Sequence, residues 1–362
     1  MRYYKLAPIL ICSLIALSVQ SCTNAPTPER DIVYTFIGPS DLELYLADSE
    51  GTDPIQLTDL GGVSYLPKQS PNGRYLIFQY YDPYTELSDF FLVDLHNGFQ
   101  VSAITSGGTL LVPSEVSWSP DSTSIIYGDV QPDGSEMDVF KLDIESGSIQ
   151  NLTDNCGVWD TFPSWSPTGQ LIAFVSDRLV IDCSSKKTDE IWLIDLETDQ
   201  LMQLTNNHEY LWEDVYPSWS PDGTRLAFYR FSFGGENYPG GIQGLWTLEV
   251  STMAEELLVE LPTKMFGESP IWSPDGKYIA YVDGAMDEND IWIVSAEGQD
   301  PIHLTKLPGN ETMPSWSSDS KSLLFTYEKE DTVHLAVVSI LDREVSELPL
   351  LGEAFYGIWI TQ

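Results

Sequence analysis

The phrase Ser218-Trp219-Ser220-Pro221-Asp222-Gly223 decides how this sequence folds, because near-copies of it recur along the chain. Four further copies and two degenerate ones are centred on Trp118, Trp165, Trp272, Trp316, Gln69 and Trp359. In chain order, the steps between the seven centres are 49, 47, 54, 53, 44 and 43 residues. Periods of about 40–50 residues combined with strand patterns are typical of β-propeller blades.

Each repeat predicts four short strands. In the phrase Ser-Pro-Asp-Gly, proline presets φ, aspartate bonds its own backbone and glycine accepts a positive φ, so the phrase predicts a turn. After Trp272, apolar and aromatic runs follow at 278–282, 291–294 and 302–305. Their β-branched and aromatic residues favour strands, and no long pattern with a period of 3.6 residues competes. We therefore expect an all-β protein with four-stranded antiparallel blades.

The number of blades follows from counting strand sets. Seven sets of outer strands are present, because one set precedes the first repeat centre at 32–37, 42–47 and 55–57. This set lacks an innermost strand, and the segment around Trp359 offers one. The sequence thus predicts seven blades, with the C-terminal strand pairing into the first blade and removing an open sheet edge. Six blades are the alternative if the degenerate first set is not a true blade.

These motifs resemble the repeats of the TolB-like propellers, a WD-repeat-like family, over about residues 32–360. The resemblance implies a β-propeller fold and, for the family, mainly binding or scaffolding roles in the bacterial envelope. TolB proper carries an α/β domain before a six-bladed propeller, whereas only a short polar stretch precedes the repeats here. The resemblance is therefore to the repeat family and not to TolB itself.

Residues 1–22 have the pattern of a secretory signal. A basic start precedes an apolar run over 6–17, which is too short for a membrane-spanning helix of about 20 residues. Val19-Gln20-Ser21-Cys22 resembles a bacterial lipobox, whose cysteine is lipidated after cleavage; an ordinary signal with a chance cysteine is the alternative. We expect a signal peptide over 1–21, lipidated Cys22 with a tether over 22–31, and one propeller domain over 32–362. The protein would be exported and lipid-anchored in the cell envelope, on the periplasmic or outer side.

The charge of the chain limits the kinds of partner that we expect it to bind. The chain of 362 residues has 17 Lys and Arg against 55 Asp and Glu, a formal net charge of −38. Such a chain would repel phosphates, so no nucleic-acid partner is expected. It gains nothing electrostatically from an anionic bilayer, so membrane contact should depend on the lipid anchor alone. Hydrophobic residues make up 42% of the chain, which is enough to form a core. We expect the protein to be a monomer.

Cys156 and Cys183 are predicted to form a disulfide. Cys12 and Cys22 lie in the signal region, which leaves an even pair in an oxidising compartment. In the predicted ring, both remaining cysteines lie on the same face of the fourth blade, so a bridge is sterically feasible. Two free thiols are the alternative.

An acidic residue shortly precedes the innermost strand in most repeats. These acids are Glu115, Asp160, Asp214, Glu268, Glu311 and Glu353. Innermost strands line the central channel, so the acids are predicted to ring one channel mouth. Close carboxylates repel one another unless a cation or hydrogen-bond donors compensate. A basic partner segment, a calcium ion and backbone N–H groups of their own loops are the three alternatives, and no other cofactor is expected.

Aromatic residues in long loops of the fourth and fifth blades form a second candidate site. They are Trp159, Tyr210, Trp212, Phe233 and Tyr238. Exposed on one face, they could stack on a sugar or grip a peptide; loops packing on themselves are the alternative. The repeated tryptophan is instead interpreted as a structural wedge between sheets, and the aspartate of the turn phrase as a turn former.

Catalytic motifs are scarce. The sequence has no G-x-S-x-G, H-E-x-x-H or Walker A pattern. We therefore expect a lipid-anchored envelope propeller that is not an enzyme and that binds or scaffolds a protein or peptide, basic in charge, through its acidic channel face. The alternative is a propeller that binds or degrades polysaccharide, with a pair of channel acids as general acid and base.

Overall fold

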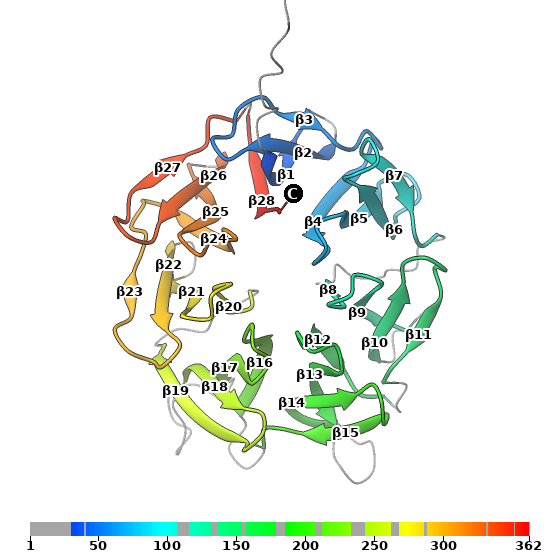
Figure 1. The fold of residues 1–362 in the computed structure, drawn as a ribbon, viewed down its shortest axis with the longest axis vertical. Helices are drawn as coiled ribbons and strands as arrows, with labels where there is room; N and C mark the ends of the chain where they lie inside the picture. The colour runs from blue at the N-terminus through cyan, green and yellow to red at the C-terminus, as the bar shows by residue number, and fades with distance from the viewer. Residues whose placement is uncertain are drawn as a thin grey trace, which may run out of the picture.

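The computed structural model describes residues 30–39, 41–106, 116–131, 136–153, 157–178, 185–206, 212–232, 243–261, 268–285, 288–330, 332–350 and 352–361. These residues form 28 strands and no helix. Figure 1 shows the strands as blades arranged in a ring, with the innermost strand of each blade facing the central axis. The fold is the all-β propeller that the repeats predicted. None of the described residues lies in a helix long and apolar enough to cross a membrane.

In each of the first four blades, four strands follow one another from the axis outwards. Blade 1 contains β28 (Ala354–Trp359), β1 (Arg30–Ile37), β2 (Leu42–Asp48) and β3 (Ile55–Gln56). Blade 2 contains β4 (Val63–Gln69), β5 (Tyr75–Asp82), β6 (Leu87–Asp94) and β7 (Gln100–Ala103). Blade 3 contains β8 (Val116–Trp118), β9 (Ser124–Val130), β10 (Met137–Asp143) and β11 (Ile149–Asn151). Blade 4 contains β12 (Asp160–Trp165), β13 (Leu171–Arg178), β14 (Ser185–Asp195) and β15 (Gln200–Gln203).

The remaining blades follow the same pattern. Blade 5 contains β16 (Trp212–Trp219), β17 (Arg225–Ser232), β18 (Gly244–Glu249) and β19 (Ala254–Glu260). Blade 6 contains β20 (Ile271–Trp272), β21 (Tyr278–Ala285), β22 (Glu288–Ser295) and β23 (Ile302–His303). Blade 7 contains β24 (Asn310–Trp316), β25 (Ser322–Lys329), β26 (Thr332–Ser339) and β27 (Val345–Glu347). Blades 3 to 7 are separate four-stranded sheets, and blades 1 and 2 are joined into one eight-stranded sheet by a single parallel pair, Leu42 of β2 with Val63 of β4. The described strands are consistent with the predicted seven blades.

The repeat centres hold neighbouring blades together. Trp118, Trp165, Trp219, Trp272 and Trp316 are only 7–9% exposed. The indole N–H of Trp219 donates to the carbonyl oxygen of Ser164 in the preceding blade at 3.0 Å, and that of Trp272 donates to Ser218 at 3.1 Å. The apolar core is divided into seven clusters, each made largely of residues from two adjacent blades. Each tryptophan is therefore a wedge between sheets, as expected.

The aspartate of the turn phrase also has the expected structural role. Asp222 accepts the hydroxyl of Ser220 at 2.6 Å and the backbone N–H of Thr224 at 3.1 Å. These hydrogen bonds hold the pKa of Asp222 below its ordinary value. Gly223 follows with φ of 72°, which suits a glycine in this turn.

The ring is closed by a contact that explains one degenerate repeat. Strand β28 pairs antiparallel with β1, which places Trp359 opposite Ile32. Gln69, which stands where other repeats have tryptophan, donates from Nε2 to the carbonyl oxygen of Thr361 at 2.6 Å. The N–H of Thr361 donates back to Oε1 of Gln69 at 2.8 Å. Gln69 thus fixes the segment after β28 to blade 2, a function that an indole with a single donor could not perform.

Changing Gln69 to alanine should weaken this closure. Loss of the reciprocal hydrogen bonds is expected to lower the free energy of unfolding by about 1–2 kcal/mol, measured by urea denaturation. Gln299→Ala serves as the control, because Gln299 is an exposed turn residue and its change should stay within about 0.5 kcal/mol. Equal stability of the two variants would contradict a closing role for Gln69.

Candidate functional site

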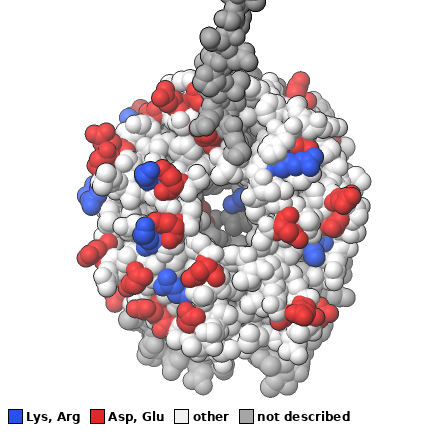
Figure 2. All heavy atoms as spheres, viewed as in Figure 1, with Lys and Arg blue, Asp and Glu red and all other residues white. Residues whose placement is uncertain are grey.

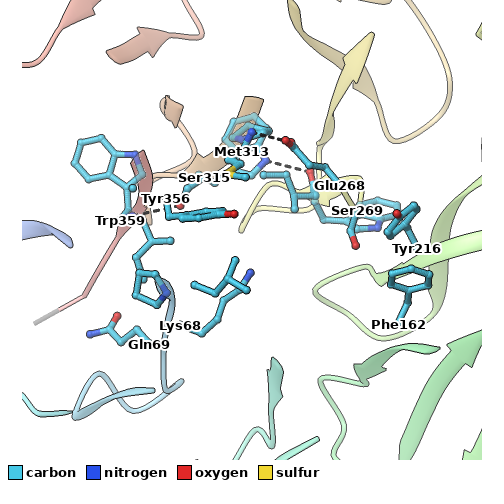
Figure 3. Close-up of a pocket in the computed structure, with 18 of the residues that line it drawn as sticks. Lys68, Gln69, Phe162, Tyr216, Glu268, Ser269, Met313, Ser315, Tyr356 and Trp359 are labelled. Carbon is cyan, nitrogen blue, oxygen red and sulfur yellow. Dashed lines mark hydrogen bonds between the residues drawn. The ribbon is translucent and has the colours of Figure 1, made fainter. Parts of the chain in front are cut away.

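A cavity of about 930 Å³ lies in the centre of the ring and is lined mainly by the innermost strands. Figure 2 shows the opening at the centre of one face, and Figure 3 shows part of the wall. Among the described residues that line it, only Lys68 and Glu268 are charged. The wall is otherwise apolar, aromatic or uncharged, which contrasts with the strongly acidic composition of the chain.

Five side chains reach this cavity because their strands carry the same irregularity. In β12, the register with β13 shifts between Thr161 and Ser164, and equivalent shifts occur in β4, β16, β24 and β28. At each shift, one residue has φ between 50° and 57°: Leu66, Phe162, Tyr216, Met313 and Tyr356. All five lie three residues before a repeat centre and line the cavity. We call these five residues the channel ring.

The channel-ring backbone is energetically unfavourable for bulky residues. The left-handed conformation costs about 1–2 kcal/mol for a residue that has a Cβ atom. A β-bulge accommodates such a residue and redirects its side chain. In four of the five strands the next residue is proline, which has no N–H to leave unpaired. The bulges therefore direct five large side chains towards the axis.

The channel ring presents aromatic surface to the cavity. Figure 3 shows Phe162 and Tyr216 next to each other, with Tyr356 on another side of the space. The rings of Phe162 and Tyr216 have centroids 4.3 Å apart and an interplanar angle of 46°. All members of the ring are half-buried, so each keeps surface that a ligand can cover. This arrangement suits an apolar or aromatic ligand.

Glu268 is the one predicted acid that lines the cavity. It lies four residues before its repeat centre, in the segment leading into β20. Its Oε2 accepts the backbone N–H of Met313 at 2.7 Å, so it links blade 6 to a channel-ring residue of blade 7 (Figure 3). Glu268 therefore combines a position in the cavity wall with a structural hydrogen bond.

The other predicted acids do not form a ring at the channel mouth. Asp160, Asp214 and Glu311 each lie five residues before a repeat centre and are 0% exposed. Glu353 lies six residues before its centre, is half-buried and is absent from the cavity wall. Glu115 lies outside the described residues. The prediction that these acids ring the channel mouth is wrong. Successive residues of a strand point to opposite faces, so acids at different distances before the repeat centre lie on different faces of the strand.

The three buried acids instead belong to a contact that we call the interblade clasp. In the clasp between blades 4 and 5, the hydroxyl of Thr205 donates to Glu190 at 2.9 Å and accepts the N–H of Ile191 at 3.0 Å. Asp214 of blade 5 lies against Thr205. It receives two hydrogen bonds from Arg230, at 2.7 and 2.9 Å. A clasp thus combines a threonine and an acid of one blade with a residue of the next.

The clasp recurs at three other interfaces with different third members. Each has an acid, a threonine and a residue of the following blade: Glu43, Thr58 and Ser64; Asp138, Thr153 and Asp160; Asp290, Thr305 and Glu311. Arg178 pairs with Asp160 much as Arg230 pairs with Asp214. Burial raises the pKa of both aspartates, and the guanidinium groups oppose this. The first acid of each clasp was missed by the sequence reasoning, although it directly precedes a buried strand residue in every case.

Glu311 occupies the clasp without an arginine partner among the described residues. Burial raises its pKa to about 8, and a hydrogen bond to Asp290 and the charge of Asp290 add to this shift. Asp290 in turn contacts Nε2 of His303 at 2.5 Å. The raised pKa favours the protonated form of Glu311, and its burial keeps it from offering a carboxylate to a partner.

The predicted aromatic site is only partly described. Trp159 is 47% exposed and lines the cavity. Trp212 is 6% exposed and lies within β16, so it does not form an exposed patch with Trp159. Tyr210, Phe233 and Tyr238 lie outside the described residues, as do Cys22 and the predicted disulfide pair Cys156 and Cys183. Among the residues that are described, no group of three or more His, Cys, Asp or Glu side chains is placed to hold a metal ion.

The pKa of Glu311 predicts a specific pH dependence. A folded-state pKa above the ordinary value stabilises the fold at low pH, and this contribution is lost as pH rises through about 8. Glu311→Gln should therefore gain stability relative to the wild type between about pH 5 and 8.5, measured by urea denaturation. The exposed Glu297→Gln is the control. Parallel curves for Glu311→Gln and the wild type would show that Glu311 does not titrate in this way.

Three comparisons place this geometry among known proteins. The chain is 30% identical over 132 residues to the uncharacterized peptidase YuxL of Bacillus subtilis, a match that covers 36% of this chain and 19% of that protein. TolB from Acinetobacter baumannii has a TM-score of 0.56 at 16% identity, covering 92% of this chain and 67% of that one. An oligogalacturonate lyase from Vibrio parahaemolyticus has a TM-score of 0.66 at 16% identity, covering 86% and 87%. The chain spans from 17% to 53% of the length of the curated relatives it matches.

These comparisons correct one expectation. The scarcity of catalytic motifs led to the expectation that the protein is not an enzyme, but the similar proteins include a peptidase and a lyase. The motifs sought in the sequence are those of particular hydrolase, metalloprotease and nucleotide-binding sites. Their absence therefore does not exclude catalysis in a propeller.

The family comparison agrees with the repeats and the fold. Residues 215–357 match the model of the TolB beta propeller domain, a match that spans most of blade 5, all of blades 6 and 7 and part of β28. The same turn phrases, wedges and bulges occur in blades before residue 215. The chain therefore contains a TolB-like β-propeller.

Proposed function

We propose that this protein is a binding module of the bacterial cell envelope and that its central channel holds an apolar peptide segment of a partner protein. The channel ring is the observation that carries this proposal. Glycine would adopt the left-handed conformation at these positions without the steric cost. Five large side chains occupy them instead, and all five face the cavity. Strained residues of this kind cluster at ligand-binding sites.

The chemistry of the wall sets the character of the partner. The acids expected to attract a basic segment include three that are buried in interblade clasps. The cavity wall instead offers the aromatic pair Phe162 and Tyr216 together with Met313. An apolar segment gains about 25 cal/mol for each Å² of apolar surface that it removes from water. The proposed partner segment is therefore apolar, not basic.

Location in the envelope is part of the proposal. Residues 1–21 have the pattern of an export signal, and Cys22 stands where a lipidated cysteine would follow it. The similarity to TolB supports the same compartment. A lipid anchor at Cys22 would tether the propeller, over residues 32–362, close to envelope partners.

Binding should depend on the channel ring. We expect the double variant Phe162→Ala and Tyr216→Ala to bind apolar heptapeptides at least about tenfold more weakly than the wild type, because both walls of the aromatic pair are lost. A peptide array followed by fluorescence polarisation measures this effect. Tyr84→Ala is the control, because Tyr84 is 91% exposed and lies away from the cavity. Unchanged binding by a folded double variant would contradict the proposal.

A second candidate function is the binding or cleavage of a glycan beside Trp159, which lines the cavity. Burial and the nearby charge of Asp177 raise the pKa of Asp189 to about 6. Asp177 accepts the backbone N–H of the exposed Trp159 at 2.9 Å. Two neighbouring carboxyl groups, one of them with a raised pKa, next to an exposed aromatic ring are an arrangement that glycan chemistry can use. Asp214 cannot act as one of these carboxyl groups, because it is buried and paired with Arg230.

Glycan turnover would be expected to fall at least about a hundredfold in Asp189→Asn if this second function holds. Reducing-end release from oligogalacturonate and other acidic oligosaccharides provides the measurement. Asp300→Asn, an exposed turn change, is the matched control. Absence of turnover by the wild type would remove cleavage, and absence of glycan binding as well would remove this candidate.

A further inference from the structure

We infer that Lys68 makes the central channel selective for a peptide segment that ends in a free carboxylate. This inference rests on the function proposed above and adds the chemical class of the ligand. It concerns the one basic side chain among the described residues of the cavity wall, which are otherwise apolar or uncharged, except for Glu268.

Lys68 differs from the basic residues of this protein that a carboxylate holds in place. Several described basic side chains are paired with carboxylates: Arg74 with Asp94, Arg178 with Asp160, Arg230 with Asp214, Lys277 with Asp275 and Lys321 with Asp319. Among the described residues, the ammonium group of Lys68 has no ion pair or hydrogen bond. Its partner, if it has one, is therefore expected to come from a ligand.

The backbone around Lys68 is fixed, which gives its side chain a defined origin. Lys68 lies in β4 two residues after the channel-ring residue Leu66 and is paired with Ile77 of β5. Its carbonyl oxygen accepts the indole N–H of Trp118 in blade 3 at 3.2 Å. Figure 3 shows Lys68 on the wall that faces the space between Tyr356 and the Phe162–Tyr216 pair. The side chain is half-buried and borders the same space as the channel ring.

An ammonium group in such a place favours an anion. Apolar surroundings strengthen the interaction between opposite charges relative to bulk water, and they penalise an unpaired charge. The other charged residue of the wall, Glu268, lies across the ring from Lys68. It already accepts the backbone N–H of Met313 in the neighbouring blade. A carboxylate on the ligand would therefore gain a charge-assisted hydrogen bond from Lys68.

A peptide C-terminus matches the remaining features of the wall. Pro67, Pro163 and Pro314 line the cavity next to channel-ring residues and have no N–H groups, so these parts of the wall offer few backbone donors to a ligand. A peptide backbone supplies N–H donors, and apolar side chains suit Phe162 and Tyr216. The terminal carboxylate then supplies the charge that complements Lys68.

The test compares three fluorescein-labelled peptides of the sequence Phe-Leu-Phe-Leu-Phe by fluorescence polarisation. The first has a free C-terminus, the second is a C-terminal amide, and the third is an amide with glutamate in place of the central residue. We expect the wild type to bind the acid at least about tenfold more tightly than the amide, as a charge-assisted bond implies. Lys68→Gln should bind the two equally, and Lys68→Arg should restore much of the preference. Lys306→Gln, an exposed change outside the cavity, should behave like the wild type.

The outcomes separate this inference from the proposed function. Equal binding of acid and amide by the wild type, with both weakened by Phe162→Ala, would overturn the role of Lys68 and keep the apolar channel site. If Phe162→Ala changes nothing, or if no peptide binds, both proposals fail. If the amide with a central glutamate binds as tightly as the peptide with a free C-terminus, Lys68 recognises any carboxylate. That result would overturn the selectivity for chain ends.

An NMR measurement on the Lys68 side chain itself completes the test. Reductive ¹³C-methylation gives each lysine an NMR signal, and the Lys68 signal is identified by its loss in Lys68→Arg. Addition of the acid peptide should shift this signal, whereas the amide should leave it in place. A shift of equal size with both peptides would indicate general occupancy of the channel and would contradict a contact with the carboxylate.

Discussion

The attachment of each blade to the next is the constraint on which this structure depends. A four-stranded blade has no interior of its own, and its apolar faces are buried only against neighbouring blades. The indole of Trp272 illustrates this, because it packs in a cluster shared by blades 5 and 6 and donates to the carbonyl oxygen of Ser218. The interblade clasp adds a polar contact, as Thr205 and Asp214 show. Ring closure by β28 and Gln69 then completes the last interface.

The clasp brings acidic groups together in a buried place, and the protein compensates for them in three ways. Asp214 and Asp160 are paired with Arg230 and Arg178. Glu311 has no such partner among the described residues, and its raised pKa means that a proton takes the place of the guanidinium. Ser64 avoids the second charge altogether. The same geometry is thus maintained with different chemistry, because an uncompensated buried charge would cost several kcal/mol.

The sequence predicted the fold because the turn phrase and the wedge are local and recur. Trp219 and Asp222 have the structural roles that their repetition indicated. The candidate site was harder to predict, because a shift of one residue moves a side chain to the other face of a strand. Asp214, five residues before its centre, is buried, whereas Glu268, four residues before, lines the cavity. The X-Pro pairs before the centres were the available signal for the channel ring, but the bulge itself depends on pairing with the neighbouring strand.

The innermost strands can carry these bulges because four of the five bulged strands have a partner on one edge only, and β4 adds to its pairing with β5 only a single pair with β2, Leu42 opposite Val63. A register shift in β16 disturbs its pairing with β17 and no other strand in its blade, so the cost is confined to one ladder. The wedge and the clasp lie on either side of the bulge, at Trp219 and Asp214, and hold its ends in place. The side chain at position 216, between them, can therefore differ in chemistry from blade to blade while the wedge and the clasp are kept. This separation allows the channel ring to specify a ligand while the seven interfaces maintain the fold.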